Sequence, residues 1–299
     1  MLALVVAVAL VAAGAVLWAA GPLRHSTASG VQLDPSAFSA GACTAFPPTA
    51  GDRHTTVFLD AGHGGLDPGA VGSTSSGATV DEGTVTLPVE LDAAALLRAH
   101  GYRVVVSRTT DSNVVRLAPV DLSGSELSLQ GAHDDVAARD VCANLSGAAA
   151  LVGIYFDSGA SPADGGSVTT YDTARPFSAA NLRLATLVQK DTLAAMNAQG
   201  WQIPDDGVQP DSVEGSLVPT SSTSALAEAA AHYGHVLLLG PADAGFFATP
   251  SEMPGALVEP LFVTDPFEGT LAASPSAQQV MAGGIARAVE QFLAPTASG

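Results

Sequence analysis

The chain carries a histidine in a glycine-rich turn directly after a short apolar run, a pattern typical of a metal-binding turn. His63 stands between Gly62 and Gly64 and follows the apolar residues 57–59. Glycine adopts backbone angles that other residues resist, so the turn can hold an imidazole rigidly at the end of a buried strand. Open α/β sheets bind ligands at the carboxyl ends of their strands, and imidazole is a common metal ligand. The alternative interpretation is that His63 only forms hydrogen bonds within its loop.

Two glutamates are further candidates for chemistry. Glu82 precedes a segment whose apolar residues have helical spacing, and an acid at that point stabilises the helix dipole. Glu259 follows the apolar residues 255–258 and precedes Pro260. A carboxylate at the end of an apolar strand indicates a cleft, so we expect Glu259 to be functional. Glu82 on its own fits either an ordinary helix-start acid or a metal ligand.

The elements that must position these residues alternate between strands and helices. Strands are predicted at residues 57–59, 102–108, 149–156, 235–240 and 255–261. Helices are predicted at residues 134–145, 181–196 and 276–293. A further helix is predicted to begin at residue 87, with Pro88 in its first turn, and to end at a C-cap formed by Gly101. Residues 204–214 are predicted to be an exposed acidic loop. Strands that alternate with helices form βαβ units. The sequence therefore predicts one α/β domain, a mostly parallel twisted sheet with helices on both faces.

The first residues are apolar enough to cross or enter a bilayer. No charge occurs before Arg24, so residues 1–21 are interpreted as a signal peptide or as a membrane anchor formed by residues 2–21. Either interpretation predicts an exported protein of the cell envelope. Residues 22–53 are rich in Ser, Ala, Pro and Gly and are predicted to be a flexible tether, which leaves residues 54–295 for the folded domain.

The net charge excludes some classes of binding partner, and the cysteine content indicates whether a disulfide can form. The net charge of −18 makes nucleic acid and anionic lipid poor partners. Cys43 and Cys142 are the two cysteines of the chain, and an isolated pair in an exported protein favours one disulfide. Two unpaired buried thiols are the alternative.

Five segments together resemble a known family. They are residues 59–65, Glu82 with Val85 and Leu87, residues 101–108, Arg139 with Ala143 and Asn144, and residues 254–259. In this order they are similar to the motifs of the zinc-dependent N-acetylmuramoyl-L-alanine amidases, the type 3 amidase family of bacterial cell-wall hydrolases, although Ala61 stands where proline is usual. The resemblance covers residues 56–293 and implies an amidase/phosphorylase-like fold.

The resemblance also implies a zinc hydrolase. In that family two histidines and a glutamate hold Zn²⁺, which lowers the pKa of a bound water and polarises the amide carbonyl. Carried over to this chain, His63 and Glu82 are zinc ligands and Glu259 is the general base and acid. The bond cut joins the lactyl group of N-acetylmuramic acid to the L-alanine of the stem peptide, so peptidoglycan and its muropeptides are the expected partners.

The third ligand position departs from the family. Tyr155 stands where the family has its second ligating histidine. A phenol must ionise to bind zinc well and has an ordinary pKa of about 10, so the implied zinc site is weakened. Three substitutes are open: Tyr155 itself as a phenolate, Asp157 on the same face of the strand, or a histidine from elsewhere such as His133.

Two functions are therefore expected from the sequence. The first is an active muramoyl-amidase of the envelope whose zinc site has adapted to Tyr155. The second is a catalytically silent protein of the same fold that binds muropeptide or a wall enzyme as a regulator or scaffold. The retention of His63, Glu82 and Glu259 favours the first function, and the changed ligand favours the second.

Overall fold

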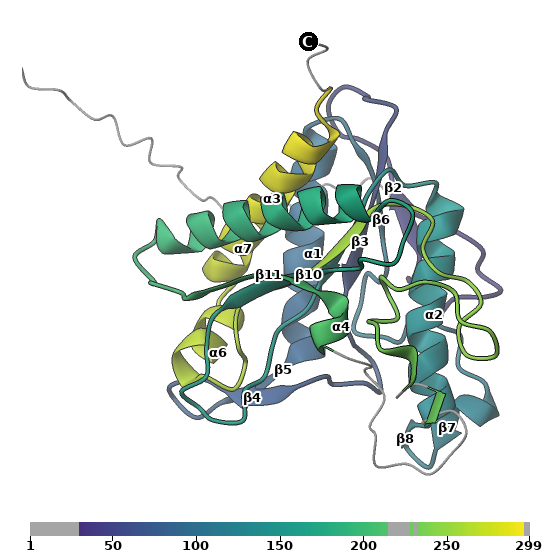
Figure 1. Cartoon of the computed structure of the whole chain (residues 1–299), viewed down its shortest axis with the longest axis horizontal. Coiled ribbons are helices and arrows are strands. Elements are labelled where there is room, and N and C mark those ends of the chain that lie inside the picture. Colours follow the sequence, from purple (N-terminus) through teal and green to yellow (C-terminus); the bar gives the residue numbers. More distant parts are fainter. Residues whose placement is uncertain (1–29, 215–227, 230–231, 296–299) are drawn as a thin grey trace, which may run out of the picture.

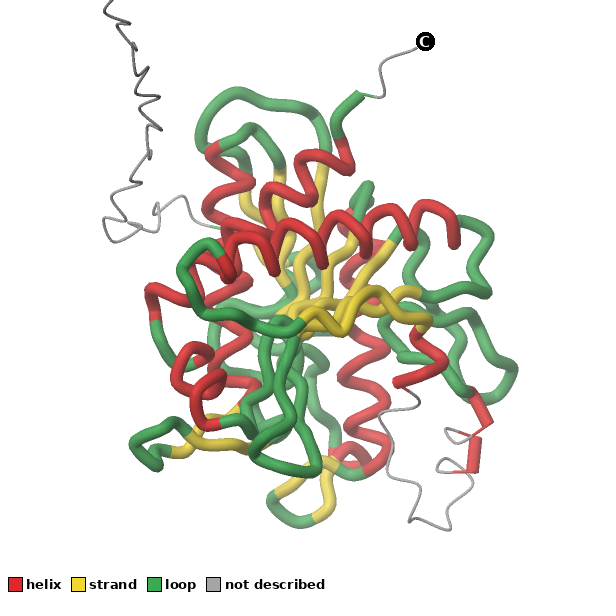
Figure 2. The backbone as a smooth tube through the Cα atoms, turned by 60° about the vertical axis from the view of Figure 1, so that its left-hand side comes forward, coloured by secondary structure: helices red, strands yellow, loops and turns green. Residues whose placement is uncertain are grey.

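A central eight-stranded sheet organises the structure (Figures 1 and 2). The computed structural model describes residues 30–214, 228–229 and 232–295. The sheet contains β1 (Val31–Gln32), β2 (Thr44–Phe46), β3 (Thr56–Ala61), β6 (Arg103–Val106), β9 (Leu151–Ile154), β10 (Ser167–Tyr171), β11 (Asp205–Pro210) and β12 (Gly255–Glu259). Their spatial order is β1-β2-β6-β3-β9-β12-β10-β11. The run β6-β3-β9-β12 is parallel, as is the pair β10-β11, while β1-β2, β2-β6 and β12-β10 are antiparallel.

Helices cover both faces of this sheet, which confirms the predicted fold class. One face carries α1 (Glu82–Ala99), α3 (Ser178–Asn197) and α7 (Pro275–Leu293), and the other carries α2 (Leu129–Ser146) (Figure 1). Shorter elements complete the described chain: β4 (Val71–Ser73), β5 (Thr79–Asp81), the 3-10 helix η1 (Pro119–Asp121), β7 (Leu122–Ser123), β8 (Glu126–Leu127), α4 (Asp211–Glu214) and α6 (Pro266–Ala272).

The core is divided by the sheet because successive strand residues point to opposite faces. In β3, Val57 and Leu59 pack with α1, α3 and α7, whereas Phe58 packs with α2. All three side chains are fully buried. Both faces of β3 are therefore enclosed, as expected of a central parallel strand.

The position of α2 is fixed by its two ends. The Ser128 hydroxyl accepts a hydrogen bond from the amide of Gly131 at 3.0 Å, which caps the first turn. Gly147 ends the helix with φ of 62°, a left-handed conformation that glycine adopts at little cost. The predicted helix 134–145 is therefore correct in type but begins five residues earlier, at Leu129.

The start of α1 also differs from the sequence prediction. The helix begins at Glu82 rather than at residue 87, so Pro88 lies inside it. Tertiary contacts hold the turn before the proline: the Gly83 amide donates to the Pro68 carbonyl at 2.9 Å, and Arg108 donates to the Gly83 carbonyl at 2.6 Å. These bonds stabilise a turn that proline at this position would otherwise weaken.

Two predicted elements at the far side of the sheet are wrong. Residues 237–239 form a turn rather than a strand, and the Gly240 amide donates to the Val236 carbonyl at 2.9 Å. This apolar run packs against the α2 face of a sheet in which β9 already has β3 and β12 as neighbours. Residues 205–210, predicted as a loop, form the edge strand β11. A short buried apolar run and an acidic edge strand both lack the periodicity that identifies a strand.

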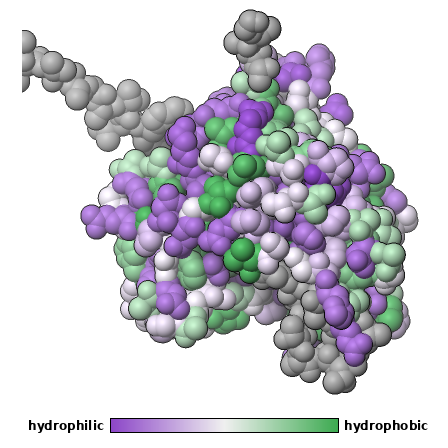
Figure 3. All heavy atoms as spheres, in the orientation of Figure 1, coloured by the Kyte–Doolittle hydropathy of each residue, from purple (hydrophilic) through white to green (hydrophobic). Residues whose placement is uncertain are grey.

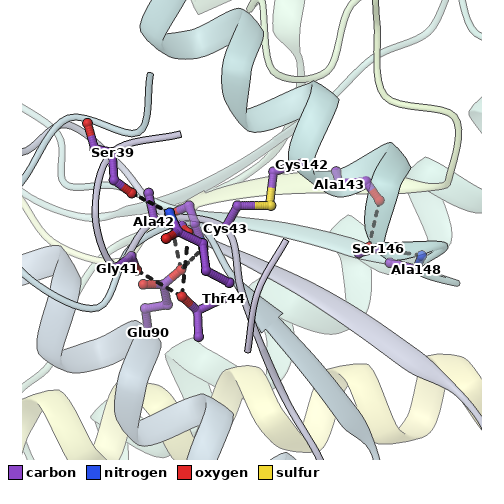
Figure 4. The surroundings of a disulfide bond; sticks show 12 residues. Ser39, Gly41, Ala42, Cys43, Thr44, Glu90, Cys142, Ala143, Ser146 and Ala148 are labelled. Carbon is purple, nitrogen blue, oxygen red and sulfur yellow. Dashed lines mark hydrogen bonds between the residues drawn. A yellow bond between two sulfur atoms is a disulfide. The ribbon is translucent and has the colours of Figure 1, made fainter. Parts of the chain in front are cut away.

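Part of the predicted tether belongs to the sheet. Within the described residues 30–53, β1 and β2 extend the sheet beyond β6. Cys43, directly before β2, forms a disulfide with Cys142 on α2 (Figure 4). Both cysteines are fully buried, so the bond fastens the start of the described chain to the helix on this face of the sheet.

The remaining N-terminal prediction, a signal or anchor over residues 1–21, lies outside the described residues. Within residues 30–214, 228–229 and 232–295, no helix has both the length and the apolar character needed to cross a membrane. The face drawn in Figure 3 has hydrophilic residues interspersed with small hydrophobic groups.

Candidate active site

His63 lies at the carboxyl edge of β3 on a strained turn that two arginines brace. Its φ of 57° is unusual for a residue with a side chain. The Arg139 guanidinium donates to the His63 carbonyl at 2.8 Å, and Arg108 donates to the carbonyl of Gly62 at 3.1 Å. Both arginines are buried, and their hydrogen bonds fix the backbone of the residues that position the imidazole.

The imidazole of His63 lies between two carboxylates. Its Nδ1 is 2.8 Å from Asp67 Oδ2, and its Nε2 is 3.2 Å from Glu82 Oε2. Although burial opposes protonation, the charge of Glu82 and the hydrogen bond to Asp67 raise the pKa of His63 to about 10. Asp67 fixes the orientation of the ring and leaves Nε2 directed at Glu82, which is how carboxylates commonly support a metal-binding histidine.

Glu82 is fixed at both of its carboxylate oxygens. Oε1 accepts from the amide of Phe156 at 2.9 Å, just past the end of β9, and Oε2 accepts from the amide of Ala70 at 2.9 Å. The residue is buried and is the first residue of α1. The Glu82 carboxylate therefore links three segments by hydrogen bonds: the loop that contains Ala70, the start of α1, and the end of β9.

Tyr155 follows β9 and packs beside His63, with ring centroids 5.3 Å apart and planes at 72°. Its hydroxyl donates to Asp60 Oδ2 at 3.1 Å, and the other oxygen of Asp60 accepts from Arg139 Nη1 at 2.6 Å. Burial and the charge of Asp60 raise the pKa of this phenol well above its ordinary value. To coordinate a metal, the hydroxyl must leave Asp60 and lose its proton.

Glu259 ends β12, one strand beyond β9. The parallel register pairs Val258 with Ile154, so Glu259 and Tyr155 follow these partners at the same edge of the sheet. The Glu259 Oε2 atom is shielded from solvent. The fold therefore brings His63, Tyr155 and Glu259 to the carboxyl edge of β3, β9 and β12. The hydrogen bond from the Phe156 amide holds Glu82 at the same edge.

A cavity of about 600 Å³ opens beside the site, and His63 and Tyr155 line it. His133, on α2, lines the same cavity, with Nδ1 3.0 Å from Asp134 and Nε2 buried without a hydrogen bond. The side chain of Asp157 accepts from the amide of Ser158 at 2.6 Å. Thus His133, but not Asp157, contributes to the cavity wall.

The arrangement fits two protein ligands of a zinc ion. Donor atoms bound to one tetrahedral zinc lie roughly 3.3 Å apart, close to the 3.2 Å between His63 Nε2 and Glu82 Oε2. Within the described chain, no third His, Cys, Asp or Glu donor converges on this pair, since the group of three that does converge is Asp172, Asp211 and His235.

Sequence reasoning misses Asp67, which orients His63. Its position four residues after the histidine in a tight turn is the available signal. Arg108 and Arg139 tie the glycine-rich turn to the sheet by donating to backbone carbonyls, and Asp60 pairs with Arg139.

Comparisons with known proteins agree with the fold and identify the family. Residues 57–291 match the family model described as N-acetylmuramoyl-L-alanine amidase. The chain is 28% identical over 239 residues to the N-acetylmuramoyl-L-alanine amidase AmiA of Salmonella typhimurium, covering 79% of this chain and 75% of the relative. Two solved structures have the same fold. One is the CwlD amidase of Clostridioides difficile in complex with the GerS lipoprotein, with 19% identity, a TM-score of 0.57, and coverage of 80% of this chain and 98% of that one.

The other is the N-acetylmuramoyl-L-alanine amidase AmiC2 of Nostoc punctiforme, with 24% identity, a TM-score of 0.54, and coverage of 82% of this chain and 100% of that one. The family match extends from the second residue of β3 to near the end of α7, so it includes every element that carries the site. It confirms the resemblance predicted from the five motifs. The chain belongs to the N-acetylmuramoyl-L-alanine amidase family.

Proposed function

We propose that this protein hydrolyses the amide bond between the lactyl group of N-acetylmuramic acid and L-alanine in peptidoglycan. The observation that carries the proposal is the pairing of His63 Nε2 with Glu82 Oε2 at 3.2 Å, with Asp67 supporting the ring from behind. Family membership supports the same reaction. A substrate in the cell wall requires an exported enzyme, which agrees with a signal or anchor at residues 1–21.

Zinc is the cofactor that the family implies, and we propose His63 and Glu82 as its protein ligands. When bound there, the ion would supply Lewis acidity and a water of lowered pKa. The chain itself orients the ligands through Asp67, Arg108 and Arg139. We propose Glu259 as the group that takes a proton from water and delivers it to the leaving amine of L-alanine.

The experiment is cleavage of a defined muropeptide by the full chain purified in detergent. Mass spectrometry should detect the free stem peptide, with its new amino group on L-alanine, together with the sugar acid. A chelator should stop the reaction. Glu259→Gln should lower the rate at least about 100-fold, the usual size of a general acid–base contribution. Glu252→Gln is the matched control, because Glu252 is exposed, and it should leave the rate unchanged.

A second function is favoured by one observation, the hydrogen bond from Tyr155 to Asp60. A phenol that stays on Asp60 leaves zinc with two protein ligands, and the protein would then bind muropeptide without cutting it. Calorimetry on the same muropeptide separates the two functions. Binding that neither a chelator nor Glu259→Gln alters, with no product, would reject the amidase proposal and support the binding function.

A further inference from the structure

Two aspartates are brought together at the edge of the sheet by the register of two parallel strands. Tyr171, the last residue of β10, pairs with Pro210, the last residue of β11. The next residue in each strand's path is an aspartate, Asp172 and Asp211 respectively. Equivalent positions past the ends of neighbouring parallel strands face the same space, so the two carboxylates must lie side by side.

A histidine from a distant part of the chain meets both carboxylates. Nδ1 of His235 is 2.9 Å from Asp172 Oδ2 and 3.3 Å from each oxygen of Asp211. The neighbouring amide of Val236 also donates to Asp211 Oδ2, at 3.2 Å. The histidine is thus held at the site by its backbone as well as by its ring.

The cluster holds more negative charge than its described neighbours neutralise. Asp172 and Asp211 are both 0% exposed. Asp172 Oδ1 accepts from the amides of Ala174 and Arg175, whereas its Oδ2 is buried and accepts no hydrogen bond although it faces His235. The guanidinium of Arg175 is directed to the carbonyls of Gly240 and Ser251, not to either carboxylate. Two buried carboxylates beside one imidazole are costly without a further cation.

We propose that Asp172, Asp211 and His235 form a binding site for a divalent transition-metal cation, separate from the catalytic site. The three residues offer donor atoms that all lie within 4.8 Å of one another. The 2.9 to 3.3 Å between Nδ1 and the carboxylate oxygens is close to the spacing of donors around one zinc ion, roughly 3.3 Å. One imidazole with two carboxylates is a nitrogen and oxygen donor set that suits zinc.

The site is at the opposite end of the sheet from His63. β10 runs antiparallel to β12, with Val168 opposite Glu259 and Thr170 opposite Leu257. Asp172 therefore lies toward the amino end of β12, whereas the catalytic residues lie at its carboxyl end. A metal here would take no part in the amidase reaction, so the proposal is independent of the proposed function. It would instead tie β10 and β11 to the segment that begins at His235.

The test is the zinc content of the full chain purified in detergent, stripped with a chelator and then dialysed against zinc alone. His63→Ala removes the candidate catalytic ligand and should still bind about one zinc per chain. His63→Ala with His235→Gln should bind zinc at least about tenfold more weakly, since losing a ligand costs more than losing a group that supports one. Zinc should raise the melting temperature of the first variant and leave that of the second unchanged.

A second double variant, His63→Ala with Asp211→Asn, controls for the possibility that His235→Gln loses zinc because it misfolds. The Asn amide has the same shape as the Asp carboxylate, so it should not disturb the fold. This variant too should lose zinc while its circular dichroism matches that of the parent. The proposal is overturned if His63→Ala binds no zinc, which would make the cluster a simple ion pair of protonated His235 with two carboxylates. It is equally overturned if zinc persists in both double variants.

Discussion

The phenol of Tyr155 uses Asp60 in a way that an imidazole at the same position would not. Its hydroxyl donates to Asp60 Oδ2 at 3.1 Å, and both residues are buried. The phenol thus makes a buried hydrogen bond, and while it donates to Asp60 it offers no oxygen to a metal between His63 and Glu82. The two effects can be separated by choosing what replaces the tyrosine.

Tyr155→His should strengthen zinc binding by about tenfold or more, because it restores a neutral nitrogen donor beside His63 and Glu82. If the amidase proposal holds, muropeptide cleavage should rise with it. Zinc titration monitored by calorimetry measures the first effect. Unchanged zinc affinity in a folded Tyr155→His protein would mean that position 155 does not face the metal.

Tyr155→Phe removes only the hydroxyl and is the matched control. It should lower the free energy of unfolding by about 1 kcal/mol, the net value of a typical hydrogen bond, and leave zinc affinity unchanged. If Tyr155→Phe instead loses zinc as His63→Ala does, the phenol is itself the third ligand, the first of the three substitutes that the sequence leaves open.

Asp60 and Arg139 form a buried ion pair whose partners cannot be removed singly without cost. Both residues are almost fully buried. Asp60 also accepts from the Tyr155 hydroxyl, and Arg139 also donates to the Ala61 carbonyl. Asp60→Asn should therefore lower the free energy of unfolding by about 2 kcal/mol, less than for an unpaired buried charge, because Arg139 keeps its second partner Asp135 at 3.0 Å. Urea denaturation measures this loss. Asp164→Asn on the surface is the control, and an equal effect in both variants would contradict the argument.

At the scale of elements, Glu90 joins α1 to β3 and β6. Its Oε1 accepts from the amides of Ala61 and Ser107 and from the Ser107 hydroxyl. Burial raises the pKa of Glu90 to about 8, with the charge of Arg108 opposing and that of Asp60 adding to the shift. The carboxyl is therefore protonated in the folded protein at a pH where it ionises in the unfolded chain.

The contribution of Glu90 to stability should accordingly fall as pH rises. Below a pH of about 4.5 both states are protonated, and above it the unfolded state alone loses its proton until the pH reaches about 8. Relative to Glu90→Gln, the wild-type free energy of unfolding should drop by on the order of 5 kcal/mol across this window. Chemical denaturation at several pH values gives the difference, and parallel curves for the two proteins would be the contrary result.

The elements that carry the active site are those that the sequence predicts best. β3, α1 and β12 bear glycine, acid and apolar signals that are local, so residue types and spacing suffice to place His63 and Glu259 at strand ends and Glu82 at a helix start. The fixed hydroxyl of Tyr155 cannot be predicted in this way, because it depends on Asp60, which lies 95 residues away in sequence. The cluster of Asp172, Asp211 and His235 escapes sequence reasoning because the composition of β11 is typical of a loop and that of residues 235–240 is typical of a strand.

At the scale of the whole molecule, one disulfide closes a long loop of chain. Cys43 and Cys142, whose disulfide is drawn in Figure 4, are 99 residues apart in sequence. The loop between them contains β3, α1 and β6. Cross-linking a loop of this length lowers the entropy of the unfolded chain by the equivalent of about 4 kcal/mol. The bond therefore stabilises the part of the protein that carries His63 and Glu82.

Reduction should consequently lower the melting temperature by several degrees, and the variant with both cysteines changed to serine should melt at the lower temperature whether or not reductant is present. Calorimetry with and without a phosphine reductant makes the comparison. A melting temperature that reductant leaves unchanged in the wild type, with free thiols detected, would show that the bond contributes nothing.

The outermost strand β11 has a consequence for how this protein behaves at high concentration. Among the described residues no strand pairs with β11 on its outer side. The strand contains Asp205 and Asp206, Gly207 with φ of 83°, and Pro210, which has no amide hydrogen to donate. Charged residues, kinks and proline on an edge strand prevent a second molecule from adding its own strand there. At the opposite edge, β1 has two residues, too few to template another chain. Copies at high concentration should thus remain separate rather than join edge to edge into fibres.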